Sequence, residues 1–193
     1  EVAASFTDNG QTETVTDGKG NKTTYEYDGH DRLKKTRYPD PSTAGSSSTT
    51  DYEELGYDAG SNVTSVRLRD GTSIASSYDD LNRVTLKDLP GSEPDVSYSY
   101  DLLGRMTGAS QTGHALTFGF DALGRNTSQG GPLGTVSYQY DLAGRRTRVT
   151  HPDSFYAQYD HLVTGEVSAI RENGASSGAG VVATFGYDDL GRR

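Results

Sequence analysis

A few side chains in this 193-residue sequence are of types that catalyse reactions or bind metals, and their spacing decides what they can do. The four histidines are scattered and lack the short, regular spacing of metal ligands: His30, His114, His151 and His161. The stretch "HPDSF" places His151, Asp153 and Ser154 side by side in the sequence. A hydrolytic triad needs these groups to converge from separate positions, so we expect no nucleophilic site there.

Sequence signals for phosphate, calcium and thiol chemistry are also incomplete. The glycines and lysines of "DGKGNKT" (17–23) lack the G-x-x-x-x-G-K-[ST] spacing of a phosphate-binding loop. The recurring aspartates never form the D-x-[DN]-x-[DN]-G pattern of a calcium loop. The absence of cysteine excludes disulfides and thiol catalysis. We therefore expect no enzyme activity, no cofactor and no bound metal.

The composition favours a β protein with a thin core. Hydrophobic residues make up only 32%, yet 13 Tyr and 5 Phe are too many for a typical disordered tract. Tyr, Thr and Val favour strands, while the 24 glycines, with Asn and Asp, favour turns. A net charge of −9 argues against nucleic-acid binding, and no apolar run is long enough for a membrane span. The first residues also lack the features of a signal peptide.

A repeat of about twenty residues organises the whole chain. An aspartate marks each of nine copies: Asp8, Asp28, Asp58, Asp79, Asp101, Asp121, Asp141, Asp160 and Asp188. Two steps are longer than the rest because Ser/Gly-rich insertions lie near 39–50 and 171–182. We therefore expect a single repeat region over 1–193, made of about nine hairpin copies.

Each copy reads as strand, turn and strand. Apolar residues alternate before the aspartate, as at Leu116, Phe118 and Phe120, which predicts a strand with one buried face. The D-x-x-G sequence that follows predicts a type I turn ending in a left-handed residue, which gives a hairpin with a G1 bulge. Where glycine is absent, the expected left-handed residues are Asp31, Ser61 and Asn82. The copy "YDHLVTGEV" has an extra residue, so its turn should differ.

The arginine after most turns has three plausible roles: pairing with the turn aspartate, lying across an aromatic ring, or lining a solvated edge. The leucines at the third turn position are expected to pack on the neighbouring turn, since an isolated hairpin would expose them: Leu81, Leu103, Leu123 and Leu190. The structural repeat motif that we expect comprises Tyr27, Asp28, Tyr57, Asp58, Tyr78, Asp79, Tyr100, Asp101, Gly104, Arg105, Phe120, Asp121, Gly124, Arg125, Tyr140, Asp141, Gly144, Arg145, Tyr159, Asp160, Tyr187, Asp188, Gly191 and Arg192.

The segments "YEYDGHDRL", "YSYDLLGRM", "YQYDLAGRR" and "FGYDDLGRR", with "VTDGKGNKTTYEYD" between copies, resemble the RHS/YD-repeat family. The resemblance implies an all-β ribbon of tandem hairpins, curved or spiralling, that belongs to a shell or a fibre. Such repeats occur in bacterial Rhs proteins, insecticidal toxin complexes, wall-associated proteins and teneurins. By this resemblance the chain is a non-catalytic module of a bacterial secreted or cell-surface protein, whose shell encloses or displays another polypeptide.

The resemblance and the aromatic rows suggest several binding partners and two alternative functions. The expected partners are further RHS/YD repeats of a parent chain or of neighbouring subunits, and an enclosed toxin domain. Rows of tyrosines suggest an alternative, because exposed rings could stack on carbohydrate or on another protein. These residues are Tyr25, Tyr57, Tyr78, Tyr98, Tyr138 and Tyr187. A second alternative is a self-assembling extracellular filament, since open sheet edges invite joining.

Overall fold

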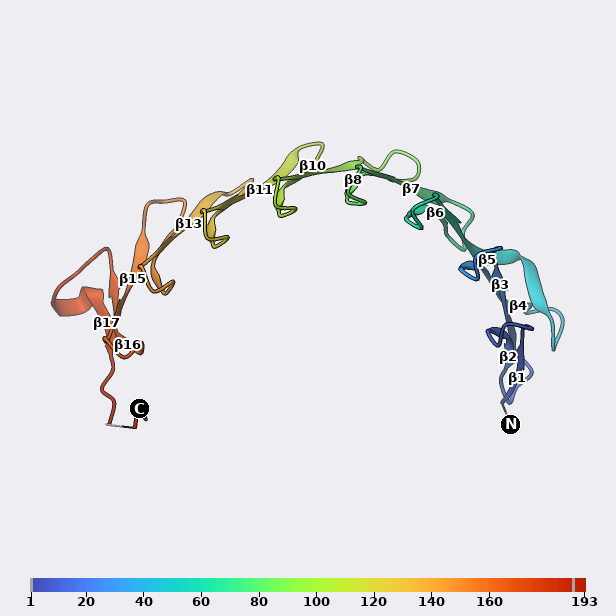
Figure 1. Ribbon diagram of the computed structural model, residues 1–193, viewed down its shortest axis with the longest axis horizontal. Helices are drawn as coiled ribbons and strands as arrows, with labels where there is room; N and C mark the ends of the chain where they lie inside the picture. The colour runs from blue at the N-terminus through green and yellow to red at the C-terminus, as the bar shows by residue number, and fades with distance from the viewer. Residues whose placement is uncertain (1, 189) are drawn as a thin grey trace. The chain divides into compact units, whose positions relative to one another are not determined.

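The computed structural model describes residues 2–188 and 190–193 and is built almost entirely of β-strands (Figure 1). The strands of the first half are β1 (Ala3–Phe6), β2 (Thr12–Thr16), β3 (Lys22–Tyr27), β4 (Leu33–Pro39), β5 (Ser47–Tyr57), β6 (Val63–Arg67), β7 (Ser73–Tyr78) and β8 (Val84–Asp88). They are followed by β9 (Val96–Tyr100), β10 (Met106–Gln111), β11 (His114–Phe120), β12 (Asn126–Gly131), β13 (Gly134–Tyr140), β14 (Arg146–Thr150), β15 (Tyr156–His161), β16 (Val167–Glu172) and β17 (Val181–Thr184). A short 3₁₀ helix, η1 (Gly178–Gly180), precedes β17.

The chain divides into two compact units, Glu1–Ser97 and Tyr98–Arg193, which we call unit 1 and unit 2. Within each unit, consecutive strands pair antiparallel, so that sequence neighbours are sheet neighbours. This is the tandem-hairpin arrangement that the repeat predicts. It depends on local contacts, because every hairpin pairs strands that are close in sequence.

The turns fall into two alternating kinds. Those that lie at or near the repeat aspartate, which we call corner turns, span residues 7–10, 28–31, 58–61 and 79–82 in unit 1 and 101–104, 121–124, 141–144 and 162–165 in unit 2. A further corner turn in unit 2 is marked by the bond from the N–H of Gly191 to the carbonyl of Asp188. The intervening turns are more varied and include both insertions. The first insertion lengthens β5 and pairs Pro39 with Ser47, and the second forms a turn and η1.

Two of the nine expected turn positions need correction. In the first copy the turn begins at Thr7 rather than Asp8, because the N–H of Gly10 bonds to the carbonyl of Thr7. In the eighth copy, Tyr159 and Asp160 lie inside β15, and the turn begins at Leu162. Asp160 instead pairs with Arg171 on the neighbouring strand. The extra residues after Asp160 move the turn along the chain, so the letters "YD" no longer mark its position.

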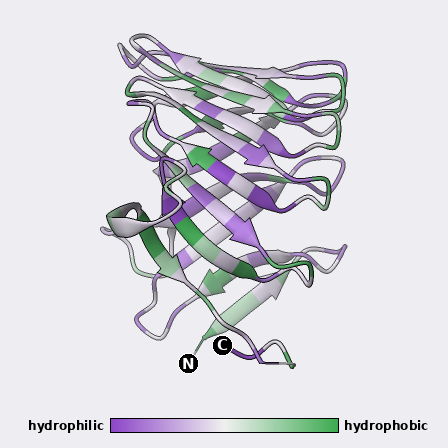
Figure 2. Ribbon diagram, turned by 90° about the vertical axis from the view of Figure 1, so that its left-hand side faces the viewer, coloured by the Kyte–Doolittle hydropathy of each residue, from purple (hydrophilic) through white to green (hydrophobic). Residues whose placement is uncertain are grey.

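The strands belong to one sheet, which is a single layer in each unit and has almost no core. Ala169, at 4% exposure, is the only buried hydrophobic residue among those described. Polar and apolar residues alternate along the strands, which is visible as short coloured segments in Figure 2. In unit 1 one face carries Leu55, Val66 and Ile74 as cross-strand neighbours. The sheets are therefore held by backbone pairing and cross-strand side-chain contacts rather than by packing against a second layer.

The register shifts next to most corner turns, immediately before the aromatic residue. For example, Glu26 pairs with Lys35, but Tyr27 pairs with Leu33, which leaves Lys34 extra. The same shift precedes Phe120 and Tyr140, where Thr127 and Thr147 are the extra residues. A bulge of this kind twists the strand and redirects the aromatic side chain. Within the described residues, no helix is both long and apolar enough to cross a bilayer.

Candidate functional site: the corner-turn ladder

The corner turns have the backbone geometry that D-x-x-G predicts. At residues 28–32 the N–H of Asp31 bonds to the carbonyl of Asp28 at 3.1 Å, and the N–H of Asp28 bonds to the carbonyl of Arg32 at 2.9 Å. The residue at the fourth turn position has positive φ, from 59° at Asn82 to 117° at Gly165. Glycine reaches this region without a Cβ clash, which explains why Gly104, Gly124 and Gly144 stand there.

The carboxylate of the first turn residue satisfies the backbone donors of its own turn. One oxygen of Asp121, Oδ1, accepts from the backbone N–H of Leu123 at 2.9 Å and of Arg125 at 3.0 Å. The other, Oδ2, accepts from the Arg125 guanidinium at 2.6 Å. The same set of bonds recurs at the corners of Asp28, Asp79, Asp101 and Asp188. Aspartate is suited to this position because both carboxylate oxygens are acceptors.

The arginine also reaches the next repeat. Nη1 of Arg125 donates to the carbonyl of Asp141 at 3.0 Å, and its guanidinium lies 4.7 Å from the ring centre of Tyr140. Arg32 makes the equivalent contacts with the carbonyl of Asp58 and, at 4.3 Å, with the ring of Tyr57. Arg105 does the same with Asp121 and Phe120. Pairing with the turn aspartate and stacking on a ring are thus combined in one side chain, and the ring belongs to the following copy.

The aromatic residue of each copy also bonds to the preceding copy. The hydroxyl of Tyr57 donates to the carbonyl of Leu33 at 2.7 Å, and that of Tyr140 donates to the carbonyl of Asn126 at 2.8 Å. In both cases the acceptor directly follows the arginine of the preceding copy. Tyr27, Tyr78 and Tyr187 make the equivalent bond to Thr12, Val63 and Val167. Each copy is therefore completed by its neighbour in two ways.

The exposure of the arginines shows how much a following copy covers. The Arg125 side chain is 26% exposed, whereas that of Arg192, which has no copy after it in this chain, is 73% exposed. Both arginines bind their own turn aspartate. Arg125 in addition contacts the ring of Tyr140 and the carbonyl of Asp141 in the next repeat.

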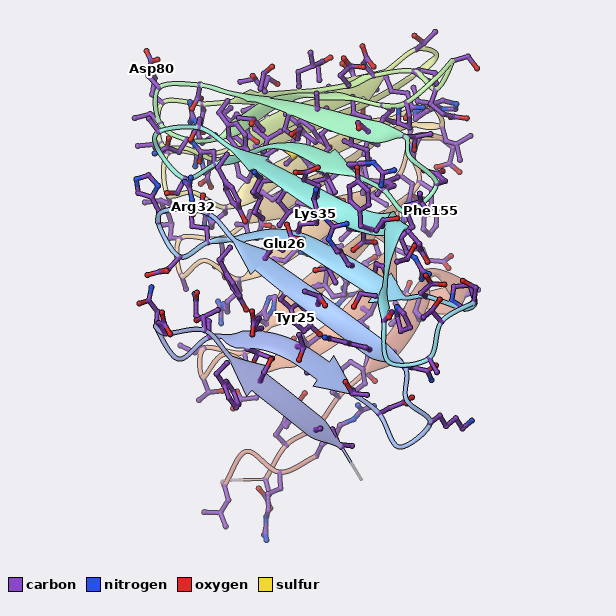
Figure 3. All side chains as sticks on the ribbon, turned by 90° about the vertical axis from the view of Figure 1, so that its right-hand side faces the viewer. Tyr25, Glu26, Arg32, Lys35, Asp80 and Phe155 are labelled. Atoms are coloured by element: carbon purple, nitrogen blue, oxygen red, sulfur yellow. The ribbon has the colours of Figure 1, made fainter. Side chains whose placement is uncertain are left out.

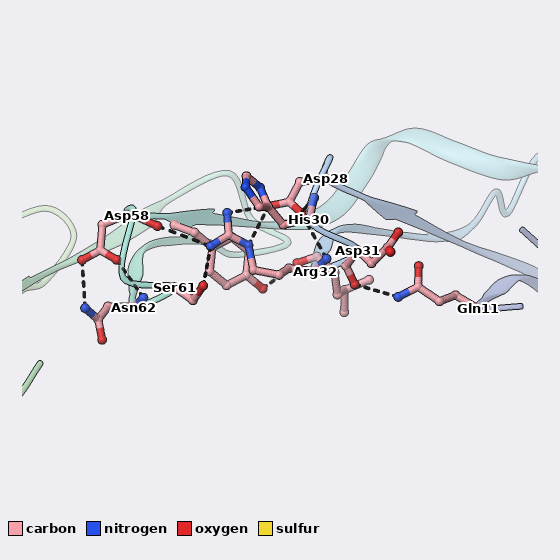
Figure 4. A network of polar contacts seen from close by, with 10 residues as sticks. Gln11, Asp28, His30, Asp31, Arg32, Asp58, Ser61 and Asn62 are labelled. Carbon is pink, nitrogen blue, oxygen red and sulfur yellow. Dashed lines mark hydrogen bonds and ion pairs between the residues drawn. The ribbon is translucent and has the colours of Figure 1, made fainter. Parts of the chain in front are cut away.

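In unit 1, side chains of the turns themselves add further links (Figure 4). The left-handed residues Asp31, Ser61 and Asn82 each receive a side-chain hydrogen bond from an earlier corner. Their donors are Asn9, Arg32 and Asn62, at 2.7, 2.9 and 2.7 Å. A side chain at this position is strained, so these residues exchange some backbone strain for a bond between turns. The sequence alone did not indicate this role.

The hydrogen bonds lower the pKa of the corner carboxyl groups. At Asp28, the Arg32 side chain first and the backbone N–H groups of His30 and Arg32 after it lower the pKa to about 2, against a smaller opposing effect of desolvation. At Asp101 and Asp121, desolvation is the largest single influence and raises the pKa, but the bonds from Arg105 and Arg125 outweigh it. The net pKa of these two groups is therefore also lowered.

The chemistry of the ladder is structural, because its charged groups are already engaged with one another. The described residues contain no cluster of three or more His, Asp or Glu side chains arranged to hold a metal ion. The "HPDSF" stretch forms a turn: the N–H of Ser154 bonds to the carbonyl of His151, and Ser154 takes the left-handed position. The Asp153 carboxylate accepts from the backbone N–H of Phe155. His30 lies exposed in a corner turn, and His161 ends β15.

The tyrosines of the rows are neither buried in a core nor fully exposed as a binding surface. All six residues of the rows are half-buried. The Arg146 guanidinium lies 4.5 Å from the ring centre of Tyr138, whose hydroxyl bonds to Gln129. In Figure 3, Tyr25 lies in the middle of the unit 1 strands, whereas Arg32 and Asp80 lie at the corner-turn side.

The turn leucines do not pack on neighbouring turns, and this expectation was wrong. Leu81, Leu103, Leu123 and Leu190 are all exposed. The interval between adjacent corners is filled instead by the arginine and the ring, which lie at the base of the turn. The leucines project beyond that layer.

Comparisons with known proteins agree with this geometry. The RHS Repeat family matches residues 6–43 and 120–155. Among solved structures, the Photorhabdus luminescens Tc holotoxin pore with a TccC3 mutation matches 91% of the chain at a TM-score of 0.62 and 15% identity. The TcdB2-TccC3-Cdc42 complex matches 98% of the chain at a TM-score of 0.51 and 14% identity. No curated protein sequence matches the chain.

The matched segments contain corner turns of both units, and the chain spans 12% of the length of each of these two toxin chains. At such low identity the structural likeness establishes the fold. The family match adds the repeat itself, whose arginine and aromatic residue recur from copy to copy in the same geometry. Two segments of this chain, residues 6–43 and 120–155, are therefore similar to the RHS Repeat family, and the fold of the chain is similar to that of the Tc toxin structures.

Proposed function

We propose that this chain is a wall segment of a larger RHS shell, in a bacterial secreted or cell-surface protein. It acts by its position and shape, without catalysis, and the complete shell encloses or displays another polypeptide. Its partners are further repeats of the same parent protein and the polypeptide inside. Because the chain spans 12% of the matched toxin chains, enclosure is a property of the whole protein rather than of this segment.

The observation that carries the proposal is the ladder in which each corner is completed by the next. Arg105, Arg125 and Arg145 each bind their own aspartate and a carbonyl of the following corner. Such a scheme can continue through many copies, because each copy that carries the arginine bonds to a carbonyl of its successor. It makes an extended wall and gives stability that is summed over neighbours.

The two faces of the sheet differ, as a wall between two environments would require. In unit 2 one face carries Tyr138, Val149 and Ala157 as cross-strand neighbours. The opposite face carries Gly119, Ser128, Ser137 and Thr150 in the same way. With no second layer over either face, the apolar one is available to contact an enclosed polypeptide.

Limited proteolysis of the complete parent protein tests the proposal. We expect the enclosed polypeptide to resist proteinase K in the native protein and to be cut after unfolding. The double variant Arg125→Ala/Arg145→Ala should open the wall and allow cleavage of the enclosed segment. Lys87→Ala, an exposed residue outside the ladder, is the matched control and should leave protection intact.

An enclosed segment that is cut equally fast in the native protein and in the double variant would overturn the shell function. The carbohydrate-binding alternative makes a different prediction for the isolated chain. It requires binding on a glycan array that is lost in Tyr98→Ala or Tyr138→Ala.

A further inference from the structure

The chain contains two Asn-Gly pairs, Asn9-Gly10 and Asn173-Gly174. In such a pair the backbone nitrogen of the glycine lies close enough to attack Cγ of the asparagine and close a five-membered ring. Glycine obstructs this attack least, because it has no Cβ. Every other asparagine of the chain precedes a residue with a Cβ, which crowds the approach. All four residues of the two pairs are exposed to water, so only their turns distinguish them.

The first pair occupies the end of the corner turn at 7–10. Gly10 is the fourth residue of that turn, and its N–H closes the turn by bonding to the carbonyl of Thr7 at 2.9 Å. The nitrogen that would attack is therefore already engaged. The side-chain amide of Asn9 donates to Oδ1 of Asp31 at 2.7 Å. This carboxylate would repel the negative charge that forms on the amide oxygen during attack, so both contacts oppose the reaction.

The second pair occupies the middle of the turn at 172–175. Asn173 and Gly174 both have positive φ, 48° and 73°, as in a type I′ turn. The turn is closed by the N–H of Ala175, which bonds to the carbonyl of Glu172 at 2.9 Å. Gly174 is thus one position earlier in its turn than Gly10 is in the corner turn. Among the described residues, none accepts a hydrogen bond from the Gly174 N–H.

The side-chain amide of Asn173 is also held differently from that of Asn9. Its oxygen, Oδ1, accepts from the backbone N–H of Tyr156 at 3.0 Å. The N–H of Asn173 in turn donates to the carbonyl of Tyr156 at 2.8 Å, so the asparagine is fixed against the first residue of β15. A backbone donor on the amide oxygen withdraws electrons from Cγ and stabilises the oxyanion that forms when Cγ is attacked.

We propose that the folded chain deamidates itself at Asn173 and spares Asn9. Hydroxide from the solvent removes the Gly174 N–H proton, and the nitrogen forms a bond to Cγ of Asn173. The bond from Cγ to Nδ2 then breaks, and Nδ2 leaves as ammonia with a proton taken from water. Water opens the resulting succinimide at either carbonyl, which yields aspartate or isoaspartate. The turn contributes by holding the reacting groups together, with no oxidant or cofactor.

The reaction would alter the second insertion. Isoaspartate carries one more carbon in the backbone, which misaligns the bond that closes the turn between Glu172 and Ala175. The same turn anchors Arg171, whose Nη1 donates to the carbonyl of Ala175 at 3.0 Å and whose guanidinium pairs with Asp160. The insertion near 171–182 should therefore loosen with time, whereas the corner turns keep their own bonds.

Incubation of the folded chain at mildly alkaline pH, followed by trypsin digestion and mass spectrometry, tests the proposal. Trypsin cuts after Lys19 and Arg171, so peptides 1–19 and 172–192 each carry one Asn-Gly pair. We expect Asn173 to convert at least roughly tenfold faster than Asn9, because reaction at Asn9 must first break a backbone hydrogen bond. In urea the two rates should converge, and Asn173 should react more slowly than in the folded chain.

Asn173→Gln is the matched control, since its longer side chain would have to form a six-membered ring. Peptide 172–192 of this variant should keep its mass, and circular dichroism checks that the variant is folded. Equal rates in the folded chain, faster conversion at Asn9, or an Asn173 that reacts faster in urea would each overturn the proposal. None of these results bears on the shell function, because that function depends on the ladder and not on this turn.

Discussion

The corner turns of the two units share a backbone and differ in how their side chains connect. In unit 1 the left-handed positions hold Asp31, Ser61 and Asn82, and each accepts a bond from an earlier corner. In unit 2 the corresponding residues include Gly104 and Gly124, which have no side chain to offer. In unit 2 the side chains of Arg105, Arg125 and Arg145 link successive corners.

The difference shows that one turn can be stabilised in two ways. A glycine removes strain at the left-handed position, and an arginine alone then joins the corners. A polar residue accepts the strain but adds a second bond. A polar residue at the left-handed position makes the tip of the turn polar, whereas a glycine there leaves the tip free to carry leucine.

Acid should have the largest effect, because it acts on all the corner carboxyl groups at once. The folded pKa of Asp28, about 2, lies below the value of an unfolded aspartate, about 3.9. The unfolded chain therefore takes up the proton first, so this stabilisation is complete above about pH 4 and is lost as the pH falls toward 2. We expect a cooperative loss of β structure in that window, measured by circular dichroism.

Hydrogen exchange on peptides from each unit would sharpen the comparison. The pKa of Asp28 is lowered to about 2, whereas at Asp101 and Asp121 desolvation is the largest single influence and raises the pKa against the bonds, so we expect these two corners to open at higher pH than the Asp28 corner. Asp28→Asn serves as a control that should flatten the pH dependence around its own turn. Simultaneous opening of both units would contradict the difference that we infer.

Removal of one arginine should have the next largest effect. Arg125→Ala loses the bonds to Asp121 and Asp141 and the contact with the Tyr140 ring. We expect the free energy of unfolding in urea to fall by roughly 2 kcal/mol. Asn62→Ala in unit 1, which loses neutral bonds to Asp58 and Asn82, should cost about 1 kcal/mol. Equal losses in the free energy of unfolding would show that the Arg125 side chain stabilises the fold no more than the Asn62 amide does.

Substitutions at the left-handed position should change the stability less, and the effect should differ between a glycine and an asparagine. Gly124, at φ 82°, becomes strained when it gains a Cβ, so Gly124→Ala should cost about 1–2 kcal/mol. Asn82→Gly relieves strain but loses the bond from Asn62, and the two effects should cancel to within about 0.5 kcal/mol. Thermal unfolding of both variants measures the pair. A clear stabilisation by Asn82→Gly would mean that the bond between turns is worth little.

The smallest expected change concerns a single hydroxyl. Phe120 occupies the position at which Tyr57 and Tyr140 bond to a carbonyl of the preceding copy. Phe120→Tyr should therefore gain about 0.5–1 kcal/mol by reaching the carbonyl of Met106, the equivalent acceptor position. Tyr57→Phe should lose a similar amount. If both substitutions left the melting temperature unchanged, the hydroxyl bond would have no net value.

The sequence was sufficient for the parts of the fold that lie within one copy. The D-x-x-G turn and its left-handed residue follow from local chemistry, because all the partners lie within five residues. The pairing of Asp with Arg was one of three roles that the sequence left open for the arginine. The twenty-residue period similarly predicted the tandem hairpins. These features need no knowledge of how one hairpin meets the next.

Contacts between copies were harder to predict. The bond from Tyr140 to the carbonyl of Asn126 depends on the register shift beside it, which leaves Thr147 unpaired. A recurring threonine two residues after the arginine, as in "GRMT", "GRNT" and "GRRT", is the sequence signal that could have indicated the bulge. The exposed leucines were misjudged because nothing in one copy shows that the arginine already fills the space below them.

The alternation of the two kinds of turn restricts how such a chain can change its length. Corner turns are separated by two strands, so a gain or loss of one whole copy leaves every later aspartate on its original side of the sheet. A gain or loss of a single strand would carry all later corners to the opposite side, and the arginine before the change would meet no ring. Genetic expansion and contraction should therefore proceed in even numbers of strands. The two insertions agree with this rule, because the first lengthens β5 and its turn, the second adds a turn and η1, and neither changes the number of strands between corners.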